Sequence, residues 1–270
     1  MRRFIRGLGV LAVLGLASRL ARLPGAAFLL AQLRGWSAYA SGATISVLQA
    51  LICLAALRLT RGMGLRRALR ELGLLASPLR PLAFALVVTS PMLIGYAATS
   101  SLDRQATVVG LLFGAFLWPL AEEILYRGYA FGQLYRHAGW GFWPAALATA
   151  AVFGFGHLYQ MVTGDLTLLG GLGVFLITAT GSVLFSWLFL RWSFNLWVPS
   201  GVHALMNLWW MLFAVDQTAL GGWLANAARA ATVVLAIVVT LVATPSPRRA
   251  QEREPASRDD APPLLREAMA

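Results

Sequence analysis

ATVVGLLFGAFLWPLAEEILYR, residues 106–127, is the stretch that decides the fold. Its apolar run, 106–124, has about the twenty residues that a helix needs to cross the hydrocarbon core of a bilayer. Two adjacent carboxylates, Glu122 and Glu123, stand in this run, and Arg127 follows shortly after. Ionisable groups at that depth are costly, and they usually face a cavity and serve a function there. The stretch therefore predicts a membrane-spanning helix that carries a functional site.

The composition of the whole chain indicates a membrane protein. Of its 270 residues, 59% are hydrophobic and only 12% are charged, whereas about a quarter of the residues in a soluble domain are charged. The apolar residues form continuous runs, and a chain in lipid must satisfy its backbone hydrogen bonds within helices or closed barrels. We therefore expect an all-α fold, a polytopic transmembrane helix bundle in one domain, 1–243. A charged tail that contains proline, 244–270, is expected to be disordered.

About eight apolar runs are separated by polar or arginine-bearing links. The first run follows two arginines and has the layout of a signal peptide, but we expect an uncleaved short helix because many spans follow it. Residues 18–35 hold three arginines, and they are open to three interpretations: part of a span, a signal-like segment or an interfacial segment. The expected spans are 4–17, 36–57, 81–101, 106–124, 140–160, 166–190, 194–213 and 223–242.

The charged residues predict how these helices are oriented. All 22 basic residues are arginine, the net charge is +11, and the arginines lie mainly between the apolar runs. A basic balance can indicate nucleic acid, but this distribution follows the positive-inside rule, so we expect no nucleic-acid partner. With the loop 58–80 in the cytoplasm, both termini are cytoplasmic and the links at Asp165 and Asp216 are external. Glu122 and Glu123 then lie toward the cytoplasmic end of their helix.

The expected location follows from the same features. Lysine is absent, which is typical of a GC-rich genome. The apolar runs place the chain in contact with the lipid bilayer, and we expect a multi-pass protein of a bacterial inner (plasma) membrane.

The first motif, Glu122-Glu123-x-x-x-Arg127, gives its two carboxylates different tasks. Glu123 and Arg127 share one helical face, in the order that favours an ion pair. Glu122 is turned about 100° away from Glu123, since a helical turn takes about 3.6 residues. We therefore predict a structural pair of Glu123 with Arg127, and a free Glu122 that acts as general base. The alternative is a charged helix end that reaches the lipid headgroups.

Two further motifs place histidines on apolar helices. In Phe153-x-x-x-His157, the histidine serves either catalysis or, as is more frequent for a lone membrane histidine, a packing hydrogen bond. In His203-x-x-x-Asn207, an imidazole and an amide share one helical face, and both can donate to one developing oxyanion. Their alternative is to bond neighbouring helices. The chain has three histidines, and the third, His137, lies in a polar loop.

The three motifs, in this order on successive apolar helices, resemble those of the CPBP family of intramembrane proteases. The family includes the type II CAAX prenyl endopeptidases and the bacterial Abi group, which is linked to bacteriocin immunity. All three motifs are complete here, and the resemblance covers about 106–213. It implies a hydrolase that cuts peptide bonds of a membrane protein or peptide substrate within or at the membrane.

The resemblance also implies a task for each residue of the motifs. Glu122 and His157 would hold and activate a water molecule, while His203 and Asn207 would stabilise the tetrahedral oxyanion. The supporting residues would be Glu123, Arg127 and Phe153.

A metal is an alternative for the same site. The family is often labelled a metalloprotease, although the resemblance favours a glutamate-dependent site without metal. On chemistry alone, Glu122, His157 and His203 can ligate zinc, because catalytic zinc takes three such ligands and keeps one position open. We therefore expect no resident cofactor and keep zinc as the alternative.

Two other classes of protein stay open. A non-catalytic membrane scaffold or bacteriocin-immunity-type protein is the first, because some relatives are thought to act without proteolysis. A proton-coupled transporter is the second, since intramembrane carboxylates often relay protons. The chain shows no internal repeat of the kind from which many transporters are built, so the transporter is the less favoured of the two.

Overall fold

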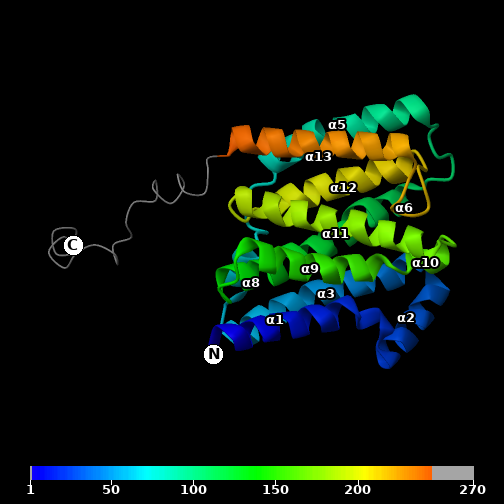
Figure 1. Ribbon diagram of the computed structural model, residues 1–270. Coiled ribbons are helices and arrows are strands. Elements are labelled where there is room, and N and C mark those ends of the chain that lie inside the picture. The colour runs from blue at the N-terminus through cyan, green and yellow to red at the C-terminus, as the bar shows by residue number, and fades with distance from the viewer. Residues whose placement is uncertain (1, 245–270) are drawn as a thin grey trace.

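The computed structural model describes residues 2–244, and they are helical with short links (Figure 1). The longer helices are α1 (Arg2–Ser18), α2 (Pro24–Trp36), α3 (Ala38–Arg61), α5 (Leu79–Thr99), α9 (Phe142–His157), α11 (Leu168–Arg191), α12 (Trp197–Leu212) and α13 (Trp223–Ala243). A continuous helical segment joins α6 (Val108–Leu111), η2 (Leu112–Leu117), α7 (Trp118–Glu123), η3 (Ile124–Phe131) and α8 (Gly132–Arg136), of which η2 and η3 are π-helical. The short elements are η1 (Leu20–Arg22), α4 (Leu65–Glu71) and α10 (Gln160–Thr163). The all-α class is confirmed, and the tail beyond Thr244 lies outside the described residues.

Six segments within residues 2–244 are long and apolar enough to cross a membrane. They are Tyr39–Arg61, Leu79–Thr99, Val108–Arg136, Phe142–Thr163, Leu168–Arg191 and Trp223–Ala243. Helices α1, with 17 residues, and α12, with 16, are slightly shorter and run lengthwise beside the others (Figure 1). The protein is therefore a multi-pass membrane protein, and the expected bundle of about eight helices agrees with this arrangement.

The outer surface of the bundle is suited to lipid. Apolar side chains in the middle of several helices, such as Val87, Leu147, Leu176 and Val238, are at least half exposed. On a soluble protein a surface of this kind would drive association, whereas in a bilayer it contacts acyl chains.

The helices alternate in direction, so that α1 begins and α13 ends at the same end of the bundle (Figure 1). The links that contain Asp165 and Asp216 lie at the opposite end. This is the arrangement that the arginine distribution predicted, and which end faces the cytoplasm stays a prediction. Most of 18–35 is taken up by η1 and α2, which packs along α3 and exposes Phe28 and Leu29. Its interfacial placement also stays a prediction.

The helix that carries the two carboxylates is longer than the sequence predicted. A span of 106–124 was expected, with Glu122 toward its cytoplasmic end, but the helical segment runs over Val108–Arg136. Glu122 therefore lies near the middle of the span. Arg127 forms an ion pair with Glu123 within the same helix. The span therefore does not have to end before Arg127, because this charge is paired.

A close backbone contact holds the start of α12, the helix that carries His203 and Asn207. Gly73 has a φ of +82°, and a Cβ there would lie 2.2 Å from the carbonyl oxygen of Phe194. The N–H of Leu196 donates to the carbonyl oxygen of Gly73 at 3.3 Å. The link between α4 and α5 is thereby fixed against the turn before α12, where the approach requires glycine.

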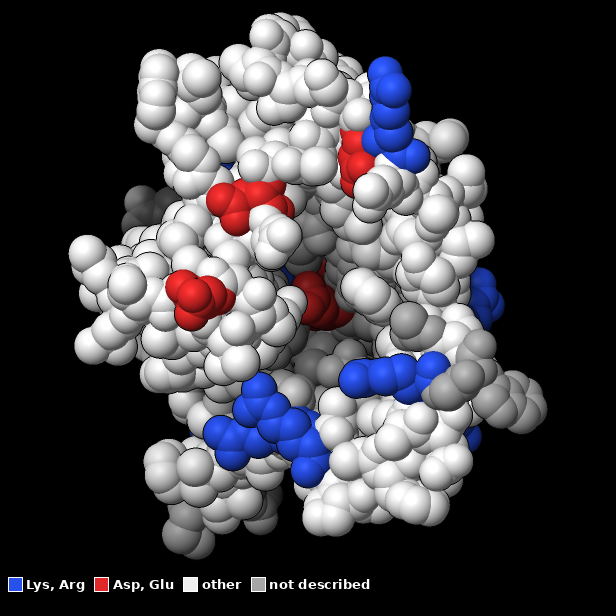
Figure 2. All heavy atoms as spheres, turned by 90° about the vertical axis from the view of Figure 1, so that its right-hand side faces the viewer, with Lys and Arg blue, Asp and Glu red and all other residues white. Residues whose placement is uncertain are grey.

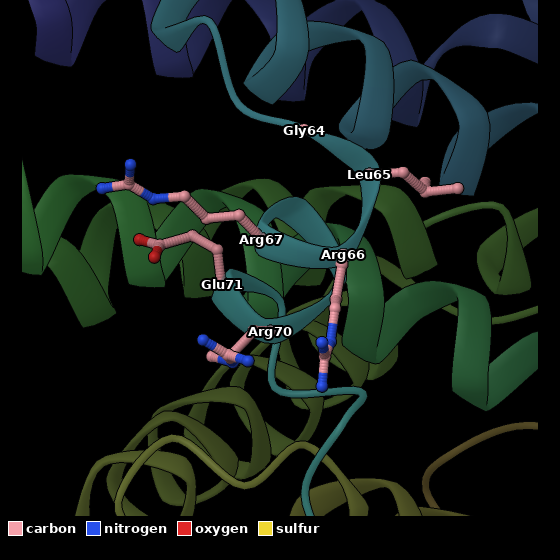
Figure 3. A pocket seen from close by; sticks show the side chains of 6 residues that line it. All are labelled: Gly64, Leu65, Arg66, Arg67, Arg70 and Glu71. Atoms are coloured by element: carbon pink, nitrogen blue, oxygen red, sulfur yellow. The ribbon is translucent and has the colours of Figure 1, made fainter.

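Glu71, at the end of α4, ties this short helix to the end of α8. Its carboxylate accepts hydrogen bonds from His137 and Gln133, and it lies 3.5 Å from the guanidinium of Arg136. Figure 3 shows Glu71 pointing to the same side of α4 as Arg67. Burial raises the pKa of the Glu71 carboxyl, but the hydrogen bond from His137 and the charge of Arg136 outweigh burial and hold this pKa below its ordinary value.

The orientation of the bundle is tested with reporter fusions. A reporter fused after Val242 and one inserted within 61–70 should both read as cytoplasmic, because arginines at that end are retained inside. Reporters placed near Asp165 or Asp216 should read as external. A cytoplasmic signal at Asp216 would contradict the eight-helix topology.

The contribution of Glu71 to the stability of the fold should depend on pH. Glu71→Gln should lower the melting temperature of the solubilised protein at neutral pH by a few degrees, as measured by differential scanning fluorimetry. The folded pKa of Glu71 lies below the unfolded value, 4.5, so its ionised form stabilises the fold above that value and the benefit is lost as the pH falls through the folded pKa. The difference from wild type should therefore disappear in acid. Arg67→Gln, on the same helix, is the control, and an undiminished difference in acid would refute the assignment.

Candidate active site

Four side chains that the sequence singled out line one cavity. Glu122 comes from the end of α7, His157 from the end of α9, and His203 and Asn207 from α12. The cavity has a volume of about 740 Å³. It opens at the end of the bundle opposite the chain termini, where Figure 2 shows a central hollow with acidic atoms inside it. The three motifs therefore meet in space.

Behind the cavity lies a completely buried ion pair. Nη1 of Arg127 is 3.0 Å from Oε1 of Glu123, and both side chains are 0% exposed. The pair is the one that the four-residue spacing predicted. The guanidinium also lies over the rings of Phe153 and Phe185, with Cζ 4.9 and 5.1 Å from their centroids. Its Nε and Nη2 make no hydrogen bond within residues 2–244, so these aromatic faces supply part of the stabilisation.

His203 connects the two carboxylates. Its Nδ1 donates to Oε1 of Glu123 at 2.8 Å, because a carboxylate only accepts. Its Nε2 lies 3.8 Å from Oε2 of Glu122. Oε1 of Glu123 thus accepts from both Arg127 and His203. The sequence did not predict this second bond, since Glu123 and His203 are far apart in the chain; the only general signal is that a buried imidazole needs partners for its nitrogens.

His157 is held by its own helix. Its Nδ1 donates to the carbonyl oxygen of Phe153 at 2.9 Å, so in the neutral ring Nε2 has a free lone pair. The ring of Phe153 lies 4.4 Å from the imidazole. Phe153 therefore contacts both His157 and Arg127, and this explains why a phenylalanine precedes the histidine by one helical turn.

Asn207 is oriented by the helix that carries the carboxylates. Its Nδ2 donates to the carbonyl oxygen of Gly114 at 3.5 Å, which leaves the second amide hydrogen available. Gly114 belongs to η2 and is buried, and a Cβ there would lie 2.6 Å from Cε of Met211. Close packing of α12 on η2 therefore sets the position of Asn207.

The residues do not fit a metal centre. Among residues 2–244, no three His, Cys, Asp or Glu side chains come together in a group that could hold a metal ion, and Glu122, His157 and His203 are no exception. One nitrogen of His203 already serves Glu123. The remaining histidine, His137, bonds to Glu71 at the other end of the bundle.

Two charged residues that the sequence reading did not connect with the site also line the cavity. They are Asp216, in the link between α12 and α13, and Arg229, on α13. An arginine inside a predicted span is the signal that could have drawn attention to Arg229.

Comparison with known proteins finds a family match over part of the chain. Residues 104–209 match the model of the type II CAAX prenyl endopeptidase Rce1-like family, and this range contains all three motifs. No curated protein and no solved structure matches the chain significantly. The matched range lies almost wholly within the core expected from the motifs, 106–213. Residues 104–209 of this multi-pass membrane protein therefore form an Rce1-like domain of the CPBP family of membrane proteases.

Proposed function

We propose that the protein is an intramembrane endopeptidase and that the cavity is its active site. The observation that carries the proposal is the convergence of Glu122, His157, His203 and Asn207 on one cavity. Its walls are mostly apolar, as a site for a membrane-embedded peptide requires, and four of its polar side chains come from the motifs of a protease family. The substrate is a membrane protein or membrane-associated peptide.

In this mechanism Glu122 and His157 activate the water. The side chain of Glu122 is 32% exposed and, within residues 2–244, forms no ion pair with an arginine, in contrast to Glu123. No hydrogen bond joins Glu122 to His157 within the described residues, although both line the cavity. A water held between Glu122 and Nε2 of His157 would give its proton to the carboxylate as its oxygen attacks the peptide carbonyl.

Two side chains of α12 then stabilise the oxyanion that forms. Asn207 offers its free amide hydrogen, and a doubly protonated His203 offers the hydrogen on Nε2 while Nδ1 stays bonded to Glu123. The carboxylate of Glu123 balances the charge of that ring, and Arg127 fixes Glu123. When the peptide C–N bond breaks, the proton taken by Glu122 passes to the leaving amine.

The location is part of the proposal. We place the protein in a bacterial inner membrane with both termini in the cytoplasm. Because the cavity opens at the end opposite the termini, substrates would then reach the site from the external half of the bilayer.

The first test separates the two glutamates. Glu122→Gln should lower the rate of cleavage by roughly 10²–10⁴, because a general base is lost. It should leave the melting temperature unchanged. Glu123→Gln should instead unfold the protein at lower temperature, since breaking a buried ion pair costs about 3–5 kcal/mol. Cleavage is measured by comparing new peptide termini in membranes that contain each variant. Asp165→Asn, an exposed acid outside the cavity, is the control.

Near-normal turnover by Glu122→Gln would show that the tasks of the glutamates are misassigned. If the protein alters no peptide termini at all, a non-catalytic scaffold becomes the better explanation.

The second test concerns metal. A strong chelator should leave activity unchanged, and elemental analysis of the purified protein should find less than one zinc per chain. Asn207→Ala should then reduce the rate by about 10²–10³, the effect of losing one oxyanion donor. Stoichiometric zinc whose removal and return switch activity off and on would overturn the metal-free mechanism.

A further inference from the structure

Arg229 is a partly buried charge that forms no ion pair within residues 2–244. It is the single charged residue of α13, a segment otherwise apolar enough to span the membrane. It lines the cavity that contains Glu122, His203 and Asn207. A charge at such a position is costly, and it usually marks the path or the binding site of a ligand.

The guanidinium of Arg229 is held in place by neutral groups. Nη1 donates to the carbonyl oxygen of Ala219 at 3.0 Å and to Oδ1 of Asn226 at 2.9 Å. The amide nitrogen of Asn226 in turn donates to the carbonyl of Leu220 at 2.8 Å. Cζ of Arg229 lies 4.5 Å from the ring centroid of Trp210. These contacts fix the orientation of the guanidinium, and none of them brings a negative charge to it.

No acid forms an ion pair with Arg229 within residues 2–244, although the carboxylate of Asp216 is near enough to stabilise its charge electrostatically. Asp216, in the adjacent link, uses Oδ1 to accept hydrogen bonds from the backbone N–H and the hydroxyl of Thr218, at 2.7 and 3.0 Å. The Nε and Nη2 of Arg229 make no hydrogen bond in the described chain. An arginine presents two parallel N–H donors to a carboxylate in this way, so the free side of the fork suits a planar anion.

Helix α12 links this arginine to the candidate catalytic groups. Trp210, on which Arg229 stacks, follows His203 by two helical turns on the same face, and both residues line the cavity. The separation along the axis is about 10 Å, at about 1.5 Å per residue. A peptide held at His203 and Asn207 therefore reaches Arg229 within the same cavity.

The place of Arg229 in the wall of the cavity favours a substrate group over a lipid headgroup. Trp223, at the start of α13, is 78% exposed, and tryptophan at a span end is typical of the membrane interface. The backbone of Arg229 lies nearly two turns further along, about 9 Å along the axis, but its guanidinium reaches back to the carbonyl oxygen of Ala219 in the link before α13. It remains part of the wall of the cavity that Glu122, His203 and Asn207 also line, which a substrate peptide would occupy.

We propose that Arg229 is a carboxylate-binding subsite that selects substrates by an anionic group away from the bond that is cut. The carboxylate is either a free peptide C-terminus or an Asp or Glu side chain, since the shared chemistry is the same. This inference rests on the proposed function, because it takes the cavity as the peptide site. Arg229 acts in binding, so its loss should raise KM and leave kcat nearly unchanged.

The test uses a fluorescently labelled decapeptide rich in Leu and Ala. It is made in three forms: with a free C-terminus, with a C-terminal amide, and with a C-terminal amide and a single Asp placed at successive positions of the peptide. Binding to the full-length protein in phosphatidylcholine nanodiscs is measured by anisotropy, and cleavage is measured separately. The wild type should bind at least one carboxylate form about tenfold more tightly than the plain amide, as expected for a charge-assisted hydrogen bond. Which form gains identifies the source of the carboxylate.

Arg229→Gln should bind all three forms equally, and Arg229→Lys should keep part of the preference. The control is Arg191→Gln, at the far end of α11, where the guanidinium bonds to Thr244 outside the cavity. Because the preference is a ratio within each variant, a partly unfolded sample does not alter it. Equal binding of the three forms by the wild type, failure of all three to bind, or an unchanged preference in Arg229→Gln would overturn the subsite.

A lipid occupant is tested by replacing phosphatidylcholine with anionic phosphatidylglycerol. The preference should persist, and its loss would assign Arg229 to lipid phosphate and overturn the proposal. The two hypotheses also separate cleanly. A preference that depends on Arg229 in a protein that cuts no peptide supports the subsite and refutes the protease, whereas cleavage without any preference does the reverse.

Discussion

The buried ion pair between Glu123 and Arg127 is the interaction on which the site depends. Two charges without exposure to solvent are tolerated only when their surroundings compensate for the lost hydration. Here the compensation comes from other helices, because Phe153 of α9 and Phe185 of α11 cover the guanidinium and His203 of α12 bonds to the carboxylate. One local pair thus contacts three other helices around the cavity, and it lies behind the groups that line the cavity.

The same pair explains why two adjacent glutamates differ. Their backbones are equivalent, but successive residues on a helix point about 100° apart. One side chain enters the protein interior, and the other keeps 32% of its surface exposed at the cavity. The difference in exposure and pairing between Glu122 and Glu123 is therefore a consequence of helical geometry.

Features that depend on local spacing could be predicted from the sequence. The apolar runs indicated the helix bundle, and the four-residue interval between Glu123 and Arg127 indicated their ion pair. Contacts between distant segments could not be predicted. The bond from His203 to Glu123 and the cover that Phe153 gives to Arg127 depend on how helices pack, and no periodicity within one helix reports that packing. The four polar groups of the motifs line one cavity, and their catalytic tasks stay a prediction.

The π-helical segments η2 and η3 lie on either side of α7, which carries both glutamates. Each π turn holds one residue more than an α turn, so it advances the angular phase of everything that follows by about 100°. The direction in which Glu122 points therefore depends on the number of residues in η2 as well as on residue type. A relative that lacks a single residue within Leu112–Leu117 can retain every motif and the same hydropathy, yet carry the carboxylate on another side of the helix. For this domain, an intact motif implies the same arrangement of side chains only when the number of residues that precede it in the helix is preserved too.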